Sequence, residues 1–595
     1  MDYGKSSAEQ SLLPRRLSVD ESSEEHHLDV LELDEFGDVS VSSWPRTLRT
    51  RWWPSRLTRR NNQKAFTAAQ HSFSRARRRR SLLFRLCRYL TLLPYAVLCF
   101  VVAFGLFLPS YSNPPQRYID LRHRVQTSAE LGRANVNDEK IFIAASLYDH
   151  NGQLLSGDWA QSVQRLIDIL GHDNVFLSVY ENDPDHQSEQ ALDDFHASLQ
   201  CPSSVVHEHL DLSQLPHVTM ADGSQQVQRI SFLAKVRNRV LLPLDDERSE
   251  AYNTTWDKLL YLNDITFDPI DAANLLFNTN KDEASGRTNY RAACAVDFIN
   301  PVKFYDTFAT RDLEGYNMGV PFYPWFTGAG KGASRQDVLN QTDAVRVKSC
   351  WGGMVAFEAK WFQPQLYGLV EGDLVVPHQK TADGSKTGEA DTSTQRYQEA
   401  DAYNDREANL TYLVSVFDSD PHHDLVRETS NLPSILPLRF RSETGTDWTA
   451  SECCLINADL AHLSPSGATS PGIYMNPYVR VAYSGSVLAW LPVTRRFERL
   501  YLFVQTILNA IAQRPSYNPR QFEEPGDEVV DRIWQWDDES LVALDNSTAG
   551  ELSKGLHGSF QDVKRIASPG QFCGRRRQTY MRERTETGER SWASV

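Results

Sequence analysis

The chain has 595 residues, of which 41% are hydrophobic, and a formal net charge of -15 at pH 7. Residues 1–43 carry eleven Asp or Glu against three Lys or Arg, whereas residues 46–88 carry fourteen Lys or Arg and no acid. A nucleic-acid-binding protein carries its positive charge on its folded domain, so a basic run before an acidic body argues against that class. The acidic, Ser-rich start cannot bury enough apolar surface to fold. We therefore predict that residues 1–88 are a disordered tail.

Residues 89–108 form an uncharged apolar run of about the length that crosses a bilayer core. Seven Arg residues lie between positions 75 and 88, and the first basic residue after the run is Arg117. The positive-inside rule then places the tail in the cytosol and the rest of the chain across the membrane. The alternatives are a buried core helix and a nuclear-localisation role for the Arg cluster. The sequence predicts a single-pass type II membrane protein.

The cysteines and glycosylation sequons agree with that orientation. Six of the eight cysteines follow the apolar run, where disulfides are permitted, but six cysteines allow fifteen pairings and the connectivity stays open. Four N-glycosylation sequons also follow it, at Asn253, Asn340, Asn409 and Asn546.

Proline-containing residues 109–137 are expected to form a short stem. After the stem, short apolar runs at 141–145, 174–180 and 259–262 alternate with helical patterns at 159–170 and 229–242. This alternation predicts an α/β fold with a mostly parallel sheet covered on both faces. There is no Gly-x-Gly-x-x-Gly and no Walker-type loop. We expect a catalytic domain over 138–500 and an extension over 501–595 that packs on it through a helix at 496–512.

Polar residues follow two of the predicted strands. Glu181 and Asn182 end the second, and Asn263 and Asp264 follow the strand at 259–262. Open α/β sheets bind ligands at the carboxyl ends of their strands, and a carboxylate there holds a divalent cation together with substrate phosphates and water. That is the donor site of a nucleotide-sugar transferase. The alternative for such residues is a turn or a helix N-cap.

Further candidates lie outside the strand ends. Arg237 and Asn238, on the helix at 229–242, are expected to face a diphosphate, since Arg matches phosphate oxygens in a bidentate way; a solvated helix face is the alternative. Later blocks place aromatics beside carboxylates and glycines, which suits a sugar site but also fits an aromatic core with disulfides. Their candidates are Asp297, Asp312, Trp351 and Glu452.

These blocks together resemble the fungal α-1,3-mannosyltransferase family of the capsule-associated type, glycosyltransferase family 69. The motifs that carry the resemblance are, in order, Ile141–Ser146, Ser178–Asn182, Lys235–Asn238, Leu262–Ile265, Arg291–Asp297, Phe304–Asp312, Val347–Gly353, Ser451–Cys454 and Phe572–Arg575. The resemblance implies a GT-A-like domain on a type II anchor in the Golgi membrane, with the catalytic domain in the lumen. It also implies retaining transfer of mannose from GDP-mannose to a mannose-containing glycan acceptor in α-1,3 linkage, with Mn²⁺ or Mg²⁺.

The resemblance assigns roles to the candidates. Asp264 is the expected metal ligand, because the strand-end signature usually written Asp-x-Asp reads Asn263-Asp264-Ile265 here and keeps one acid. The other roles are donor binding by Glu181, Asn182, Arg237, Asn238 and Asn263, catalysis by Glu452 and Asp297, and acceptor binding by Asp312 and Trp351. Asp297 and Asp312 are also candidates for a second metal contact, or else are turn carboxylates. The turn at Trp351 is alternatively a structural, disulfide-linked one.

Two other functions remain open from the sequence. One is a related transferase that uses another donor, such as a UDP-sugar, or forms another linkage. The other is a non-catalytic glycan-binding or assembly factor of the secretory pathway, because a fold alone does not establish an activity. Metal-stimulated hydrolysis of a nucleotide sugar is expected of either transferase and not of the non-catalytic factor.

Overall fold

The computed structural model describes residues 69–219, 225–363, 435–443, 448–463, 470–536, 558–576, 579–583 and 590–594. The predicted tail up to residue 68 and the sequons at Asn409 and Asn546 lie outside the described residues.

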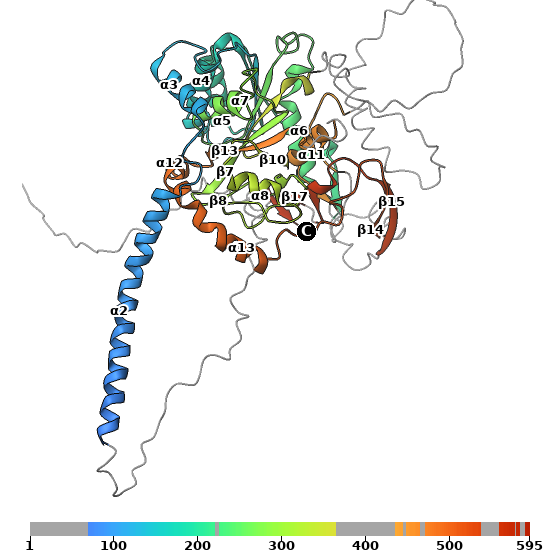
Figure 1. Cartoon of the computed structure of the whole chain (residues 1–595). Coiled ribbons are helices and arrows are strands. Elements are labelled where there is room, and N and C mark those ends of the chain that lie inside the picture. The colour runs from blue at the N-terminus through green and yellow to red at the C-terminus, as the bar shows by residue number, and fades with distance from the viewer. Residues whose placement is uncertain are drawn as a thin grey trace, which may run out of the picture.

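A long helix, α2 (Ala69–Phe107), extends away from the folded domain (Figure 1). Its segment Arg88–Phe107 is, in the described part of the chain, the one helix long and apolar enough to cross a membrane, and it is 6% buried. Residues 69–88, expected within the disordered tail, are helical and continuous with this segment. No Gly or Pro interrupts the helix before Pro94, which explains the continuity. That α2 crosses a membrane stays a prediction.

The domain is built on a ten-stranded sheet with the order β3-β2-β1-β6-β11-β7-β13-β10-β9, and β8 pairs with β7. Its strands are β1 (Ile141–Leu147), β2 (Val175–Asn182), β3 (Ser203–Glu208), β6 (Lys258–Leu262), β7 (Ala292–Asn300), β8 (Lys303–Phe304), β9 (Arg311–Asp312), β10 (Val345–Ser349), β11 (Met354–Glu358) and β13 (Ile473–Ala482). The pairs β3–β2, β2–β1, β1–β6 and β7–β13 are parallel, while β11 runs antiparallel between β6 and β7. β3, β2, β1, β6, β7 and β13 therefore point the same way, and the predicted mostly parallel sheet is confirmed.

Helices cover both faces of this sheet, as predicted. β2 and β6 are buried at every residue, which is typical of parallel strands with two covered faces. Alternate residues of β1 enter two separate cores. One core takes in α4 (Asp158–Leu170), α5 (His186–Ser198) and α7 (Pro269–Asn278). The other takes in α6 (Arg229–Arg239) and α11 (Glu452–His462).

The residues expected to form a stem, 109–137, pack on the domain instead. They contain α3 (Gln116–Thr127), whose Tyr118, Leu121 and Val125 are buried. This spacing places the three side chains on one face of a helix. The neighbouring prolines suggested an extended segment, but they lie before the helix and do not interrupt it.

The C-terminal part returns to the domain through several small elements. The predicted helix at 496–512 is a 3₁₀ turn, η10 (Arg495–Leu500), followed by α13 (Tyr501–Ile511), after α12 (Gly485–Thr494). The other α-helix and strands of the described residues are β4 (His217–Thr219), β5 (Gln225–Val227), α8 (Ala333–Leu339), β12 (Thr449–Ala450), β14 (Glu528–Trp536), β15 (Gly558–Ile566), β16 (Gly574–Arg575), β17 (Thr579–Glu583) and β18 (Arg590–Ser594). β16 pairs with β12, which ties the end of the chain to the start of α11.

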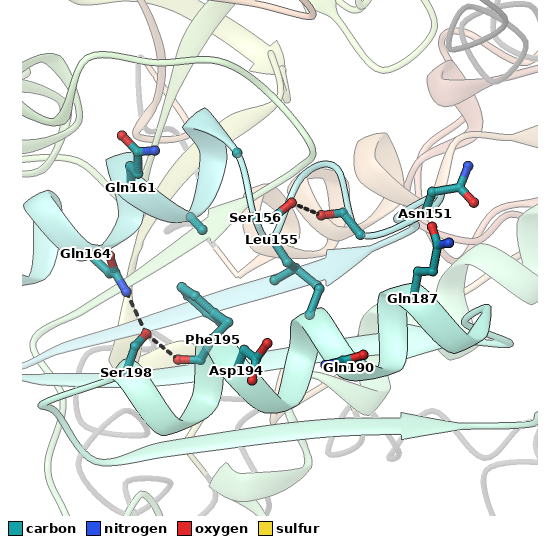
Figure 2. Close-up of a pocket in the computed structure, with 14 residues that line it drawn as sticks. Asn151, Leu155, Ser156, Gln161, Gln164, Gln187, Gln190, Asp194, Phe195 and Ser198 are labelled. Atoms are coloured by element: carbon teal, nitrogen blue, oxygen red, sulfur yellow. Dashed lines mark hydrogen bonds between the residues drawn. The ribbon is translucent and has the colours of Figure 1, made fainter.

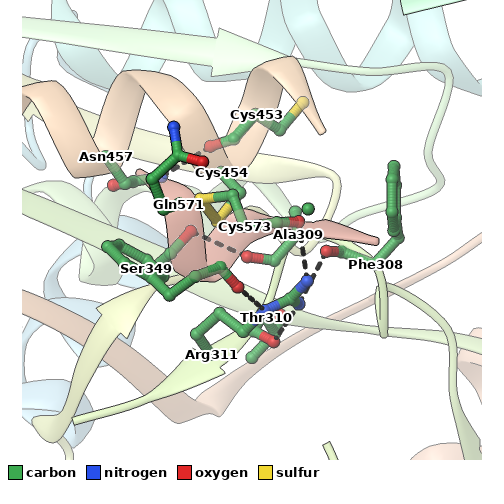
Figure 3. The surroundings of a disulfide bond; sticks show 12 residues. Phe308, Ala309, Thr310, Arg311, Ser349, Cys453, Cys454, Asn457, Gln571 and Cys573 are labelled. Carbon is green, nitrogen blue, oxygen red and sulfur yellow. Dashed lines mark hydrogen bonds between the residues drawn. A yellow bond between two sulfur atoms is a disulfide. The ribbon is translucent and has the colours of Figure 1, made fainter. Parts of the chain in front are cut away.

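Two disulfides resolve part of the pairing that the sequence left open. Cys294 is bonded to Cys350 across 56 residues. Cys454 is bonded to Cys573 across 119 residues (Figure 3). Arg311 reinforces the second bond, because its guanidinium donates to the carbonyl oxygens of Phe572 and Cys573 at 2.9 and 2.8 Å.

Removing the second disulfide is expected to destabilise the domain. Replacing Cys454 and Cys573 together by Ser should lower the free energy of unfolding by about 2–5 kcal/mol, because the unfolded chain loses a long cross-link. Thermal unfolding of the purified protein measures this change. The control is Cys201→Ala, since Cys201 is buried but unbonded. An unchanged midpoint in the double variant would contradict the expectation.

A candidate active site at the carboxyl edge of the sheet

Asn263 and Asp264 lie where the sequence predicts, directly after β6. Ala145 of β1 pairs with Leu262, and Leu147 pairs with Glu181, so parallel strands bring Glu181 and Asn263 to one edge of the sheet. The N-cap of α7 is Asp268, whose carboxylate accepts the backbone N–H of Ile270 at 2.9 Å. The N-cap alternative for Asp264 is therefore excluded, and Asp264 is half-buried at the strand end.

Arg237 links this edge to α11. Its Nε donates to Glu452 Oε1 at 3.0 Å, and one terminal nitrogen donates to Asn263 Oδ1 at 3.2 Å. The pair is nearly dry, since the side chains of Arg237 and Glu452 are 11% and 4% exposed. The guanidinium also lies 4.7 Å from the ring centroid of Trp351 and 5.5 Å from that of Tyr261. Arg237 is thus held in one place by charge, hydrogen bonds and aromatic faces.

The turn that carries Trp351 is tightly built. Trp351 Nε1 donates to Asn263 Oδ1 at 3.2 Å, and the residue is 3% exposed. Gly352 and Gly353 have φ of 61° and 65°, and a Cβ on Gly352 would collide with the carbonyl of Ala295. Trp351 is therefore buried among Arg237, Tyr261, Asn263 and Glu452, a group that we call the Arg237 cluster. It does not lie on an open surface that an acceptor could reach. The neighbouring Cys350–Cys294 bond favours the structural alternative for the turn.

Buried acids continue the network from this turn into β7. Asp306 Oδ2 accepts the N–H of Gly352 at 3.0 Å, and the N–H of Asp306 donates to Asp297 Oδ1 at 3.1 Å. Tyr483 Oη donates to Asp297 Oδ2 at 3.3 Å. Burial, and then the nearby charge of Asp306, raise the pKa of Asp297 well above its usual range.

Glu181 is another buried acid at this edge. Its Oε1 accepts the backbone N–H of Asp149 at 2.8 Å, and within the described residues its buried Oε2 has no hydrogen-bond partner. Burial raises the pKa of Glu181 to about 8. At neutral pH, Oε2 therefore belongs to a carboxylic acid group that can donate one hydrogen bond.

Replacing Glu181 by Gln should remove part of the pH dependence of stability. Above about pH 4.5 the unfolded chain releases the proton that folded Glu181 keeps, so stability falls as the pH rises toward about 8 and then levels off. In Glu181→Gln this contribution is absent. Thermal midpoints between pH 5 and 8 measure the difference, with the exposed Glu247→Gln as control. The same slope in Glu181→Gln and in the parent would contradict the assignment.

Three predicted residues make local contacts. Asn182 Oδ1 accepts from the backbone N–H of Leu210, which ties the end of β2 to the following loop. Asn238 exchanges two 2.8 Å hydrogen bonds with the backbone of Phe440, so its amide holds that segment. Asp312 caps a turn by accepting the N–H groups of Glu314 and Tyr316. Asp312 lies in β9, beyond β11, β7, β13 and β10 from β6, and the structure does not bring it to the other candidates.

The candidate site falls within a region that matches a known family. The family model described as Cryptococcal mannosyltransferase 1 matches residues 140–459, more than half of the chain. The chain belongs to this mannosyltransferase family. The matched region contains every site residue predicted from the sequence, from Glu181 to Glu452.

The other comparisons add less. No curated protein matches the chain. Among solved structures, the chain is similar to the mannosyltransferase PcManGT from Pyrobaculum calidifontis in complex with GDP-Man and Mn²⁺, with 11% sequence identity and a TM-score of 0.27. The similarity covers 72% of this chain and 77% of that chain. A TM-score this low supports no argument about the fold or the function of this chain.

The sequence did not single out several residues of the site. Asp306 and Cys453, whose thiol donates to Glu452 Oε1 at 3.4 Å, lie within the motifs named above, but no spacing rule marks a buried acid or a buried thiol. Tyr261 is a core position of β6 whose hydroxyl reaches Ser146 at 3.0 Å. Asp149 follows the first predicted strand, so its position after a strand end is a signal that could have identified it.

The donor set at the edge fits a cation that is shared with a substrate. Among the described residues, no group of three or more His, Cys, Asp or Glu side chains is arranged to hold a metal ion. Asp264 supplies one carboxylate at the strand end, so any cation there takes its other ligands from diphosphate oxygens and water, as Mg²⁺ commonly does. The residues are compatible with the predicted Mn²⁺ or Mg²⁺ but do not form a closed metal site.

A separate groove lies between α4 and α5 (Figure 2). Its volume is about 420 Å³, and its polar lining is mainly amide side chains: Gln161, Gln164, Gln187 and Gln190. None of the predicted site residues lines it. The groove is therefore distinct from the candidate active site.

Proposed function

We propose that this mannosyltransferase moves mannose from GDP-mannose to a mannose-containing glycan acceptor in α-1,3 linkage, with Mn²⁺ or Mg²⁺. The observation that carries the proposal is the arrangement of Asp264, Asn263, Arg237 and Glu181 at one edge of the sheet, within the family-matched region. The donor, the linkage and the retention of configuration also rest on the resemblance to the α-1,3-mannosyltransferases.

The residues at the edge divide the binding of a nucleotide sugar between them. A divalent cation held by Asp264 would supply Lewis-acid stabilisation of the negative charge on the leaving diphosphate. Asn263 is fixed by Arg237 and Trp351, which orients its amide beside Asp264. Glu181 is fully buried, so it supports donor binding indirectly, by holding the backbone of Asp149 at this edge of the sheet.

Glu452 and Asp297 are the proposed catalytic acids. Glu452 is held by Arg237 Nε, which fixes one carboxylate oxygen, and Asp297 is fully buried, which raises its pKa. Retention from an α-linked donor to an α-linked product proceeds through a covalent carboxylate intermediate or by attack from the face of the leaving group. Glu452 fits the first route better, since burial disfavours the ionised, nucleophilic form of Asp297.

The proposed location is the Golgi membrane, with α2 as a type II anchor and the domain in the lumen. Support comes from the Arg-rich residues before the apolar segment and from two disulfides in the domain that follows it.

Product analysis tests the transfer. The full chain in detergent would be incubated with Mn²⁺, GDP-mannose labelled with ¹³C at C1, and mannose disaccharides. NMR of the product is expected to show an α-configured mannose on O3 of the acceptor. A β product or another position would overturn the linkage. Glycan binding without turnover of any nucleotide sugar would favour the non-catalytic alternative.

A further inference from the structure

The helix α13 presents apolar side chains to the outside of the domain. Phe503, Val504, Ile507 and Ile511 are 76%, 49%, 59% and 67% exposed. Phe503, Ile507 and Ile511 are four residues apart, and Val504 lies three residues before Ile507, so the four side chains share one face of the helix. The helix has no charged residue between Tyr501 and Ile511.

The inward face of α13 carries polar residues. Gln505 and Asn509, one turn apart, are buried against the domain. Asn509 Oδ1 accepts the N–H of Val320 at 2.6 Å, and Gln505 Oε1 accepts from Arg335 at 2.7 Å. These hydrogen bonds fix the rotation of the helix. The outward apolar face is therefore specified by the fold and is the reverse of an ordinary surface helix.

This face lies beside the apolar helix α2. Phe497 of η10, directly before α13, packs against α2 at Gly105, and a Cβ on Gly105 would collide with its ring. α13 lies on the side of the domain from which α2 leaves (Figure 1). If α2 spans a bilayer, the membrane surface meets the domain close to α13.

The charges around α13 suit an anionic lipid surface. Between residues 490 and 514 there are one acid and four Arg, of which Arg496 is exposed and the others are half-buried, although the chain after Leu108 has 21 more acids than bases. The acid, Glu498, is buried and paired with Arg480 at 2.6 Å. Trp490 of α12, the helix directly before η10, is 58% exposed. Aromatic and basic residues around an apolar face are typical of membrane-interface helices.

We propose that α13, with Trp490 of α12, lies in the interfacial region of the leaflet from which α2 emerges, and that it docks the domain on lipid. The inference rests on the proposed crossing by α2, not on the transferase activity. Lipid is favoured over a second copy of the chain because α2 places this surface next to the bilayer in every molecule. The docking fixes the height and orientation of the site above the membrane.

Quenching by lipid nitroxides tests the proposal. The full chain, with Cys87→Ser, would be reconstituted in nanodiscs that contain phosphatidylcholine, phosphatidylserine and a lipid labelled with nitroxide high on its acyl chain. An environment-sensitive dye would be attached to the native, exposed Cys99 of α2, or, in Cys99→Ser, to Ile507→Cys or Val504→Cys on α13. Asp194→Cys on α5 is the water-exposed control.

We expect the dyes at positions 504 and 507 to shift to the blue and lose most of their emission to the nitroxide, while the dye at 194 does neither. Adding Phe503→Asp and Ile511→Asp should abolish the quenching at 507. Quenching at Cys99 without quenching at 504 and 507 would overturn the docking and leave α2 as an anchor. Cross-linking between two Ile507→Cys chains without lipid quenching would assign the face to a second copy. No quenching at Cys99 would overturn the anchor itself.

Discussion

Replacing Asp264 by Asn is expected to lower metal-dependent turnover of GDP-mannose by about 100-fold or more, because the variant loses the carboxylate that holds the cation against the diphosphate. The amide has nearly the same shape, so folding should be retained. The initial rate of GDP release, measured across a series of Mn²⁺ concentrations, gives both the loss of rate and any weakening of metal dependence.

Asp268→Asn is the matched control for this variant. Asp268 lies four residues away and caps α7, and Asn is as good an N-cap as Asp. Its ion pair with Arg122 is partly exposed, so losing it costs little. Equal rates for Asp264→Asn and Asp268→Asn would remove Asp264 from the site.

Arg237→Met is expected to lower the free energy of unfolding by about 3–5 kcal/mol, because it leaves Glu452 as a buried charge without its partner. The double variant Arg237→Met/Glu452→Gln should recover part of that loss, since the uncompensated charge is gone. Denaturant unfolding of the single and double variants measures the coupling between the two side chains.

The control for this pair is Arg248→Met, which breaks a surface ion pair whose Arg is 90% exposed. Such pairs contribute about 0–1 kcal/mol. If Arg237→Met is no more destabilising than Arg248→Met, the stability of the Arg237 cluster does not depend on the charge of Arg237. If Glu452→Gln alone leaves activity intact while Asp264→Asn abolishes it, Glu452 is a structural partner of Arg237 and not a catalytic acid.

Local patterns in the sequence predict much of this fold. Continuous apolar runs at β1, β2 and β6 predict buried parallel strands, because each strand has both faces covered. The spacing in 159–170 predicts α4. The residues expected to form a stem contain α3, and the spacing of its buried Tyr118, Leu121 and Val125 is a local signal for that helix. The helix at 496–512 was placed correctly in part, but its start is a 3₁₀ turn that follows another helix.

The candidate site was harder to predict because its contacts join distant residues. Strand-end position identified Glu181, Asn263 and Asp264, since that signal is local. The pairing of Arg237 with Glu452 spans 215 residues, and no spacing rule links them. Asp306 joins the site only because the turn at Gly352 folds over β7. Asp312 also lies in a block that places aromatic residues beside carboxylates, but its strand, β9, is at the end of the sheet and is separated from β6 by β11, β7, β13 and β10.

The most direct test of the central claim is release of nucleoside diphosphate by the purified full chain from a panel of nucleotide sugars, with Mn²⁺ or with chelator. We predict GDP release from GDP-mannose that requires the metal and is lost in Asp264→Asn. Metal-independent release, preference for a UDP-sugar, or no turnover of any donor together with no thermal shift from GDP and Mn²⁺ would contradict the account.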